Sequence, residues 1–292
     1  MNEEKIELPK TIEDAMKLAT DVLEAENSNF ENTRKIIMSA FKNPAAGLSV
    51  KEIILVRLIL IDANYSTQMG CRLFGLQDLA DEIFDTCKDA SIKDISDFDK
   101  KFDALLKDYI ENITAEKHQI KQLFDKKYGL RKNGEEVGLA RSLISKYCYY
   151  ASNYNFPIED SLVRKNINSV LNYFAKLEGK KDKILNFKKS EDLVKDLIIL
   201  CKTYGYEFNN LDHLVWAYGK LAKGSLSIFV SREKFIEIIK QFKIKNSVNE
   251  AEEKIDNLVK RNLRNKEKLN QLKNDNLLTE ELYKFITLCN LI

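Results

Sequence analysis

The sequence predicts an all-α protein built from two helical subdomains. Apolar residues recur at three- and four-residue spacing along almost the whole chain, which is the periodicity of amphipathic helices. Only 10 glycines and 3 prolines occur among 292 residues, so the sequence has few of the residues that end strands and form tight turns. With 44% hydrophobic residues, this composition disfavours an all-β fold and excludes a collagen-like or low-complexity disordered chain.

The periodic segments are long enough for about a dozen helices. The first opens with Thr-Ile-Glu-Asp after Pro9, which is typical of a helix N-terminus, and the second ends at Lys-Asn-Pro-Ala-Ala-Gly. The third is the most apolar, so we expect it at the centre of the fold. The predicted helices cover residues 11–25, 29–41, 49–61, 75–87, 98–113, 115–127, 135–150, 160–177, 191–204, 210–221, 232–240, 248–272 and 279–291, with room for a short strand at residues 226–230.

Changes in composition indicate how these helices are grouped. Residues 176–189 contain a lysine-rich polar connection that can be a surface loop or a subdomain hinge. After residue 224 the sequence becomes rich in Lys, Asn and Glu, and residues 246–276 are typical of a solvent-facing long helix or helix pair. We therefore expect a helical core over residues 1–224, with a helix-hairpin-helix near residues 127–150, and a C-terminal helical extension over residues 225–292.

Several classes of protein are excluded by what the chain lacks. Five cysteines, odd in number and widely scattered, argue against a disulfide framework and indicate a reducing cytoplasm. Two isolated histidines disfavour a zinc site or a Ser-His-Asp hydrolase, and no glycine-rich phosphate loop occurs, so we expect no metal and no cofactor. The N-terminus has no secretory signal, and the longest apolar run, residues 53–61, is too short to span a membrane.

The net charge of +2 conceals two oppositely charged parts. Residues 1–114 carry a net charge of −8, whereas residues 115–292 carry +10. A basic field attracts the phosphate backbone of nucleic acid, with an affinity that falls as salt rises. Double-stranded DNA is therefore the expected partner, and an acidic protein is the alternative. The sequence does not predict the oligomeric state.

A basic segment between two predicted helices has the form of a helix-hairpin-helix. Residues 117–146 contain eight basic and three acidic residues. Backbone N–H groups in a glycine-containing loop at a helix N-terminus can hold a phosphate, assisted by nearby cations. An ordinary turn between helices with a solvated charged rim explains the same pattern. The candidates for contact with the DNA backbone are Lys127, Arg131, Lys132, Gly134, Gly138 and Arg141.

The segment Asn155-Phe-Pro-Ile-Glu-Asp-Ser-Leu-Val-Arg-Lys165 leads into the next helix. Pro157 stiffens the entry, and Asp160 or Ser161 can cap the helix. A carboxylate at the mouth of a basic groove can instead activate a water or stabilise positive charge that develops on a sugar. Asp160 is therefore either a helix cap or a catalytic residue, and Arg164 and Lys165 are further candidates for phosphate contact.

Three blocks in residues 53–220 have an informative order and spacing. They are Leu58-Ile-Leu-Ile-Asp-Ala-Asn-Tyr-Ser-Thr-Gln68, then Gly138-Leu-Ala-Arg-Ser-Leu-Ile-Ser-Lys-Tyr-Cys-Tyr-Tyr150 with Phe156-Pro-Ile-Glu-Asp-Ser-Leu-Val-Arg164, then Leu211-Asp-His-Leu-Val-Trp-Ala-Tyr-Gly-Lys220. Together they resemble the helix-hairpin-helix DNA glycosylase superfamily, which includes 8-oxoguanine glycosylases and endonuclease-III-like enzymes. The middle block is similar to the hairpin's second helix and the segment that bears the essential Asp.

The resemblance implies an enzyme of DNA repair that hydrolyses the N-glycosidic bond of a flipped-out damaged or modified base. Asp160 would stabilise the oxocarbenium-like sugar and orient a water. For the aromatic candidates in the later blocks the alternative is packing in the helix core, and for Asn64 and Gln68 it is polar capping. The base-pocket candidates are Asn64, Tyr65, Gln68, Tyr147, Tyr150 and Trp216.

The chain departs from the superfamily pattern in three places. Asn133-Gly-Glu-Glu-Val-Gly138 stands where Leu-Pro-Gly-Val-Gly is expected, and Asp160 aligns only with one extra residue after Pro157. By resemblance, the nucleophilic lysine of bifunctional members falls at residues 140–142, which contain Arg141 and no lysine. Arginine stays protonated and cannot replace it, so we expect a monofunctional enzyme. Lyase activity requires Lys146, later in the helix, as the nucleophile; otherwise Lys146 is a phosphate-binding or surface lysine.

Two other hypotheses stay open. A glycosylase-derived protein that binds DNA without cleaving a bond is compatible with the altered hairpin and the missing lysine. A helical protein-interaction or defence module, in which Asp160 is only a cap, is compatible with the charge pattern.

Overall fold

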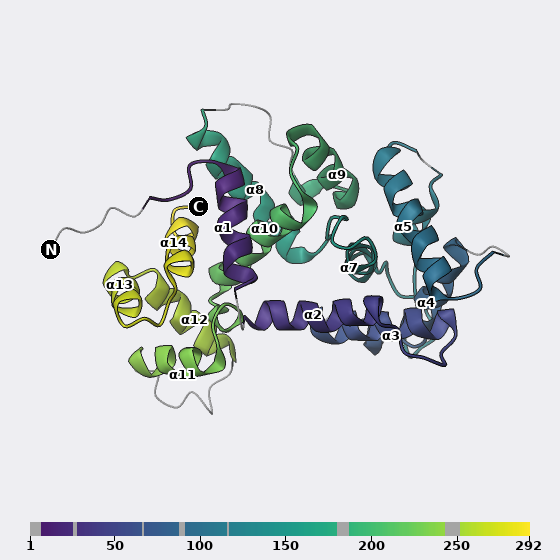
Figure 1. Cartoon of the computed structure of the whole chain (residues 1–292), viewed down its shortest axis with the longest axis horizontal. Helices are drawn as coiled ribbons and strands as arrows, with labels where there is room; N and C mark the ends of the chain where they lie inside the picture. Colours follow the sequence, from purple (N-terminus) through teal and green to yellow (C-terminus); the bar gives the residue numbers. More distant parts are fainter. Residues whose placement is uncertain are drawn as a thin grey trace. The chain divides into compact units, whose positions relative to one another are not determined.

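The computed structural model describes residues 7–25, 28–65, 67–87, 91–115, 117–179, 187–242 and 252–292 (Figure 1). These residues form fourteen α-helices and three short 3-10 helices, and they contain isolated β-bridges but no strand. The predicted all-α class is confirmed. None of the described helices is long and apolar enough to cross a membrane.

The helices follow one another with short connections. The first seven are α1 (Ile12–Leu23), α2 (Asn29–Lys42), α3 (Val50–Tyr65), α4 (Gly75–Thr86), α5 (Ile95–Glu111), α6 (Gln119–Asp125) and α7 (Arg141–Ala151). The others are α8 (Ser161–Leu177), α9 (Leu193–Tyr204), α10 (Phe208–Lys223), α11 (Arg232–Gln241), α12 (Glu252–Leu263), α13 (Lys266–Asn274) and α14 (Glu280–Cys289). The 3-10 helices are η1 (Met69–Cys71), η2 (Phe187–Lys189) and η3 (Leu226–Ile228).

The chain forms two compact units, each built from segments distant in sequence. Unit 1 comprises Met1–Asn32, Ser161–Ser190 and Asn210–Ile292. Unit 2 comprises Thr33–Asp160 and Glu191–Asn209. The expected core over residues 1–224 with an extension over residues 225–292 is a different partition of the chain, and it stays a prediction.

Unit 2 has an aromatic-rich core around α3. Ile54, Leu58 and Ile61 of α3 are completely buried, and α3 packs against α4, α5 and α7. Burial of each such side chain contributes about 1.5–3 kcal/mol relative to its exposure. The most apolar predicted helix is therefore at the centre of its unit, as its composition indicates.

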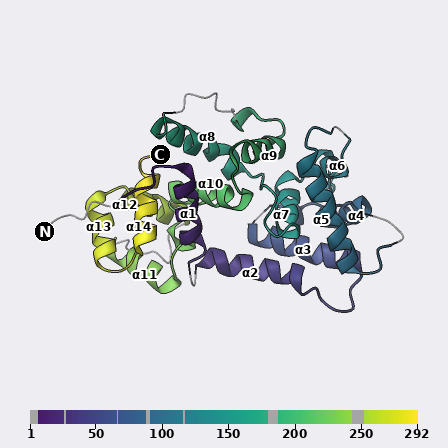
Figure 2. The same ribbon diagram turned by 45° about the horizontal axis from the view of Figure 1, so that its top comes forward.

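Unit 1 brings α1 against α14, and both views show these two helices side by side (Figures 1 and 2). Ala15, Ala19 and Leu23 of α1 are completely buried. Within the same unit α10 approaches α8 closely at Gly219, where a Cβ atom would lie 2.6 Å from the Leu162 side chain. A glycine is needed here because any larger residue would push the two helices apart.

The expected helix over residues 135–150 begins only at Arg141. Residues 127–139 instead form a loop with isolated antiparallel bridges between Lys127 and Leu139 and between Leu130 and Glu136. Leu130 also exchanges two backbone hydrogen bonds with Leu73, at 2.9 and 3.0 Å. These bonds satisfy backbone groups that a helix would otherwise use, and a helix-hairpin-helix motif is not shown.

Two predictions in the C-terminal part also need correction. The helix over residues 248–272 is a pair, because Asn265 ends the first helix and caps α13 by accepting the Lys268 N–H at 3.1 Å. The short strand at residues 226–230 is wrong, since Leu226–Ile228 is a 3-10 helix. Residues 180–186, in the predicted lysine-rich connection, and residues 243–251 lie outside the described residues.

Candidate functional site

Lys146, in the middle of α7, is only 3% exposed, although lysine is rarely buried without a partner. Its Nζ donates to Ser142 Oγ at 2.7 Å, one turn earlier on the helix. The same Nζ lies 3.5 Å from Asp160 Oδ2 and 5.3 Å from the centre of the Tyr65 ring. Lys146 is therefore not a surface lysine, and it forms an ion pair with the predicted catalytic carboxylate.

The segment before α8 holds Asp160 against α7. The Glu159 backbone N–H donates to Ser145 Oγ at 2.9 Å, and Ser145 Oγ lies 3.3 Å from the Glu159 carbonyl oxygen. Ser145 is completely buried, so water does not compete for these bonds. Because Ser145 and Lys146 are adjacent on α7, one short stretch of helix fixes both the backbone and the side chain of the Asp160 segment.

Tyrosine side chains line the other side of the lysine. Tyr65 Oη and Tyr150 Oη are 2.7 Å apart and share a hydrogen bond. Burial, together with the neighbouring Tyr65 hydroxyl, raises the pKa of Tyr150 well above its ordinary value. Tyr147 is completely buried, with its ring 5.4 Å from Phe41 and 5.7 Å from Phe102. Tyr147 and Tyr150 are thus core residues in this structure.

The polar turn after α3 presents the remaining early candidates. Asn64 is exposed and its Nδ2 donates to the Leu60 carbonyl oxygen at 2.7 Å, which is a local helix contact. Gln68 is exposed and has left-handed backbone angles, with φ at 63°. Asp62 secures this turn by accepting the Met69 and Gly70 N–H groups at 2.9 and 2.8 Å.

The sixth base-pocket candidate, Trp216, belongs to unit 1. It lies on α10, with its ring 5.0 Å from that of Phe30 and 5.0 Å from Lys220 Nζ. Arg164 and Lys165, on α8, are also in unit 1. Arg164 donates to the Ser190 carbonyl oxygen at 2.6 Å, and Lys165 is exposed.

The loop expected to bind phosphate is largely paired within itself. Lys127 lies 3.6 Å from Glu136, and Arg131 lies 3.6 Å from Glu135. The Gly134 N–H donates to the Arg131 carbonyl oxygen, and the Gly138 carbonyl accepts from Arg72. These glycines precede the N-terminus of α7 rather than forming it, because α7 begins at Arg141. Lys132 is exposed in the same turn.

Arg141, the first residue of α7, is surrounded by carboxylates. Its guanidinium nitrogens lie 3.0 Å from Asp125, 3.6 Å from Glu159 and 3.9 Å from Asp192. Sequence reasoning missed the part of Glu159 and Asp192 in this cluster. The i, i+4 spacing of Ser142 and Lys146 on one helix face could have identified the serine.

The chain matches no family, no curated protein and no solved structure. In the described part of the chain, no group of three or more His, Cys, Asp or Glu side chains could hold a metal ion. The chemistry available at the Lys146–Asp160 pair is therefore that of an ammonium and a carboxylate in a tyrosine-lined environment.

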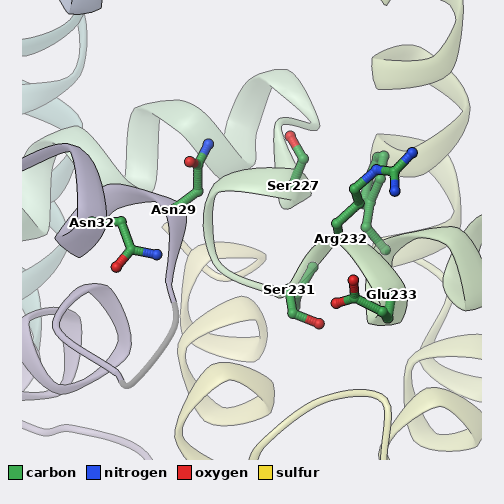
Figure 3. Close-up of a pocket in the computed structure, with 8 residues that line it drawn as sticks. Asn29, Asn32, Ser227, Ser231, Arg232 and Glu233 are labelled. Carbon is green, nitrogen blue, oxygen red and sulfur yellow. The ribbon is translucent and has the colours of Figure 1, made fainter.

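A separate cavity in unit 1 has a volume of about 740 Å³. Figure 3 shows Asn29 and Asn32 of α2 on one side, with Ser231, Arg232 and Glu233 at the start of α11 on the other. Its labelled polar side chains are exposed or half-buried, and neither Lys146 nor Asp160 lines it. The sequence contains no periodic or motif signal for this cavity, which joins residues about 200 positions apart.

Proposed function

We propose that the chain is a DNA glycosylase-like enzyme that hydrolyses the N-glycosidic bond of a flipped-out damaged or modified base. The observation that supports this most directly is the 3.5 Å separation of Lys146 Nζ and Asp160 Oδ2. The resemblance implies that Asp160 is the essential carboxylate, and Lys146 is the lysine available on the preceding helix. An ammonium, a carboxylate and two tyrosines provide the groups that the reaction needs.

In this proposal Asp160 acts on the sugar. When the bond between C1′ and the base nitrogen breaks, positive charge develops on C1′ and the ring oxygen, and a nearby carboxylate stabilises it. Asp160 also orients the water that attacks C1′ and accepts its proton, while the departing base takes up a proton. The Lys146 ammonium holds the carboxylate in one orientation, which favours the monofunctional reaction.

Access to the pair determines the second candidate. Lys146 is 3% exposed and the Asp160 side chain is 14% exposed, so a sugar reaches them only if neighbouring side chains move. A DNA-binding protein without catalysis, in which the pair is purely structural, needs no such movement. The burial of Lys146 is the observation that favours this second function.

A base-release assay on the full chain tests the proposal. The substrates are duplexes that each carry one oxidised, alkylated, deaminated or hypermodified base, and abasic sites are measured. We expect release from at least one duplex, reduced by at least about 100-fold in Asp160→Asn. Asp81→Asn, a carboxylate paired with Lys51 outside the site, should keep the wild-type rate.

Other outcomes point to the alternatives. Undiminished release by Asp160→Asn would contradict the role of this carboxylate. Borohydride trapping of a DNA adduct that disappears in Lys146→Ala would identify Lys146 as a nucleophile, with lyase activity. Salt-sensitive binding without release from any duplex would favour the DNA-binding protein, and no binding at low salt would favour a protein-interaction module.

A further inference from the structure

Arg141 joins three carboxylates that come from three different parts of unit 2. Asp125 is the last residue of α6, and its Oδ1 lies 3.0 Å from the guanidinium. Asp192 caps α9 by accepting the Lys195 N–H, and it lies 3.9 Å from the same group. Glu159, at 3.6 Å, is the residue before Asp160. A single side chain thus links the ends of two helices to the segment that carries the proposed catalytic carboxylate.

The contacts of Glu159 leave this segment little freedom. Its side chain is 8% exposed, so it depends on the guanidinium for compensation of its charge. Its backbone is bonded to Ser145, and the next residue pairs with Lys146. Residues 141, 145 and 146 lie on one face of α7, so the helix holds the Glu159–Asp160 dipeptide at three points.

The charges around Arg141 disfavour contact with a phosphate. Three carboxylates within 4 Å of one guanidinium leave the cluster net negative, and this repels a second anion. The Arg141 side chain is only 19% exposed. The planar guanidinium has five N–H donors and can bind several carboxylates at once, which a lysine ammonium does less well.

We infer that Arg141 is a positioning residue, which sets Asp160 against Lys146 by fixing Glu159, and that it is not a ligand of the DNA backbone. The inference rests on the proposed function for its catalytic consequence. Its structural part, the placement of the 159–160 segment, can be measured independently.

The first experiment separates positioning from DNA contact. Arg141→Gln and wild type are compared in single-turnover base release and in DNA binding over a range of salt, with a duplex that the wild type processes. We expect the maximal rate to fall at least about 30-fold, with the dissociation constant and its salt dependence unchanged. Arg141→Lys should recover part of the rate. Lys51→Gln removes a cation from a half-exposed ion pair elsewhere in unit 2 and should match wild type.

The opposite result would overturn the inference. A phosphate contact predicts weaker binding, a slope of log Kd against log salt that is smaller by about one, and an unchanged maximal rate. Should Arg141→Gln fold poorly, the double variant with Glu159→Gln removes the uncompensated buried carboxylate. If Arg141 acts through Glu159, the double variant should lose no more rate than Arg141→Gln alone, whereas multiplied losses would contradict the pairing.

Hydrogen exchange provides a measurement that does not need activity. The Glu159 amide should exchange at least about tenfold faster in Arg141→Gln than in wild type, while the Phe102 amide in α5 should not change. If wild type releases no base but this amide responds, the proposed function fails and the positioning stands. If the amide does not respond, the positioning fails whether or not base is released.

Discussion

Arg57 and Asp99 form a two-point ion pair that joins α3 to α5. Both terminal guanidinium nitrogens of Arg57 bind the Asp99 carboxylate, at 2.6 and 2.8 Å, and the Arg57 side chain is completely buried. The remaining donors of Arg57 reach the Ala40 and Phe41 carbonyl oxygens at the end of α2, each at 3.2 Å. Arg57 thus satisfies four acceptors from two neighbouring helices within unit 2.

Replacement of Arg57 should strongly destabilise unit 2. Arg57→Gln leaves buried carbonyl oxygens without donors, so we expect a loss of about 3 kcal/mol in the free energy of unfolding, measured in urea. Lys51→Gln disrupts the half-exposed pair with Asp81 and should cost less than about 1 kcal/mol. Equal losses for the two variants would show that burial does not govern the strength of these pairs.

Gly224, which follows α10, should tolerate no side chain. Its φ is +95°, and a Cβ atom would lie 2.0 Å from the Asp256 carbonyl oxygen in α12. Gly224→Ala should therefore lower stability by more than about 3 kcal/mol, through strain and the displacement of α12. Gly179, in the same unit, has φ +68° and open space around it, so Gly179→Ala should cost only about 1 kcal/mol. Thermal unfolding compares the two, and similar melting temperatures would count against the close approach.

The buried cysteines should resist thiol reagents in the native state. Burial raises the pKa of Cys87 to about 12 and of Cys201 to about 12, so almost no thiolate is present at pH 8. Cys71 is exposed and should react rapidly at this pH. We expect one fast-reacting thiol, absent in Cys71→Ser, and release of the others on denaturation. Native-state reaction of Cys87 as fast as that of Cys71 would contradict this.

The same shifts have a consequence for stability at high pH. The pKa of the Cys87 thiol rises from an ordinary 9.0 in the unfolded chain to about 12 in the folded protein. Between these values the unfolded thiol ionises and the folded one does not, so protons favour the native state. This contribution is complete below pH 9 and is lost as the pH rises toward 12. Cys87→Ala should reduce the steepness of alkaline unfolding, and an unchanged slope would contradict it.

Gln68 should be replaceable by glycine at a gain. Its left-handed backbone, φ 63°, is strained for a residue with a Cβ, and its side chain forms no capping hydrogen bond. Gln68→Gly should therefore be neutral or raise stability by up to about 1 kcal/mol. Asn64→Gly, within the last turn of α3, should instead cost about 1 kcal/mol. A loss in Gln68→Gly would indicate that the side chain makes contacts that compensate the strain.

The helices could be predicted because their apolar periodicity is local, whereas the errors arise from distant partners. The segment after Lys127 has helix-compatible residues, but its backbone bonds to Leu73, more than fifty positions earlier. The break between α12 and α13 depends on a cap by Asn265, a residue type that also occurs inside helices. Periodicity contains no information about either choice.

For the site, order along the chain identified Asp160 and Lys146 as candidates, but not their pairing. Fourteen residues separate them, and their approach depends on the turn through Pro157 and on the contacts of Ser145. The basic loop shows the opposite limit. Arg131 and Arg141 count as two positive charges in the sequence, yet each lies beside a carboxylate in the structure. Charge counting cannot distinguish a cation offered to a partner from one used internally.

The packing of α1 against α14 has a consequence for synthesis on the ribosome. The last segment of unit 2 ends at Asn209, so that unit can complete its fold while α14 is still untranslated. α1 leaves the exit tunnel early, with its apolar face of Ala15, Ala19 and Leu23 lacking the helix that later covers it. Unit 1 therefore closes last although it contains the earliest helix, and the nascent chain must keep that face from aggregating until translation has passed α14.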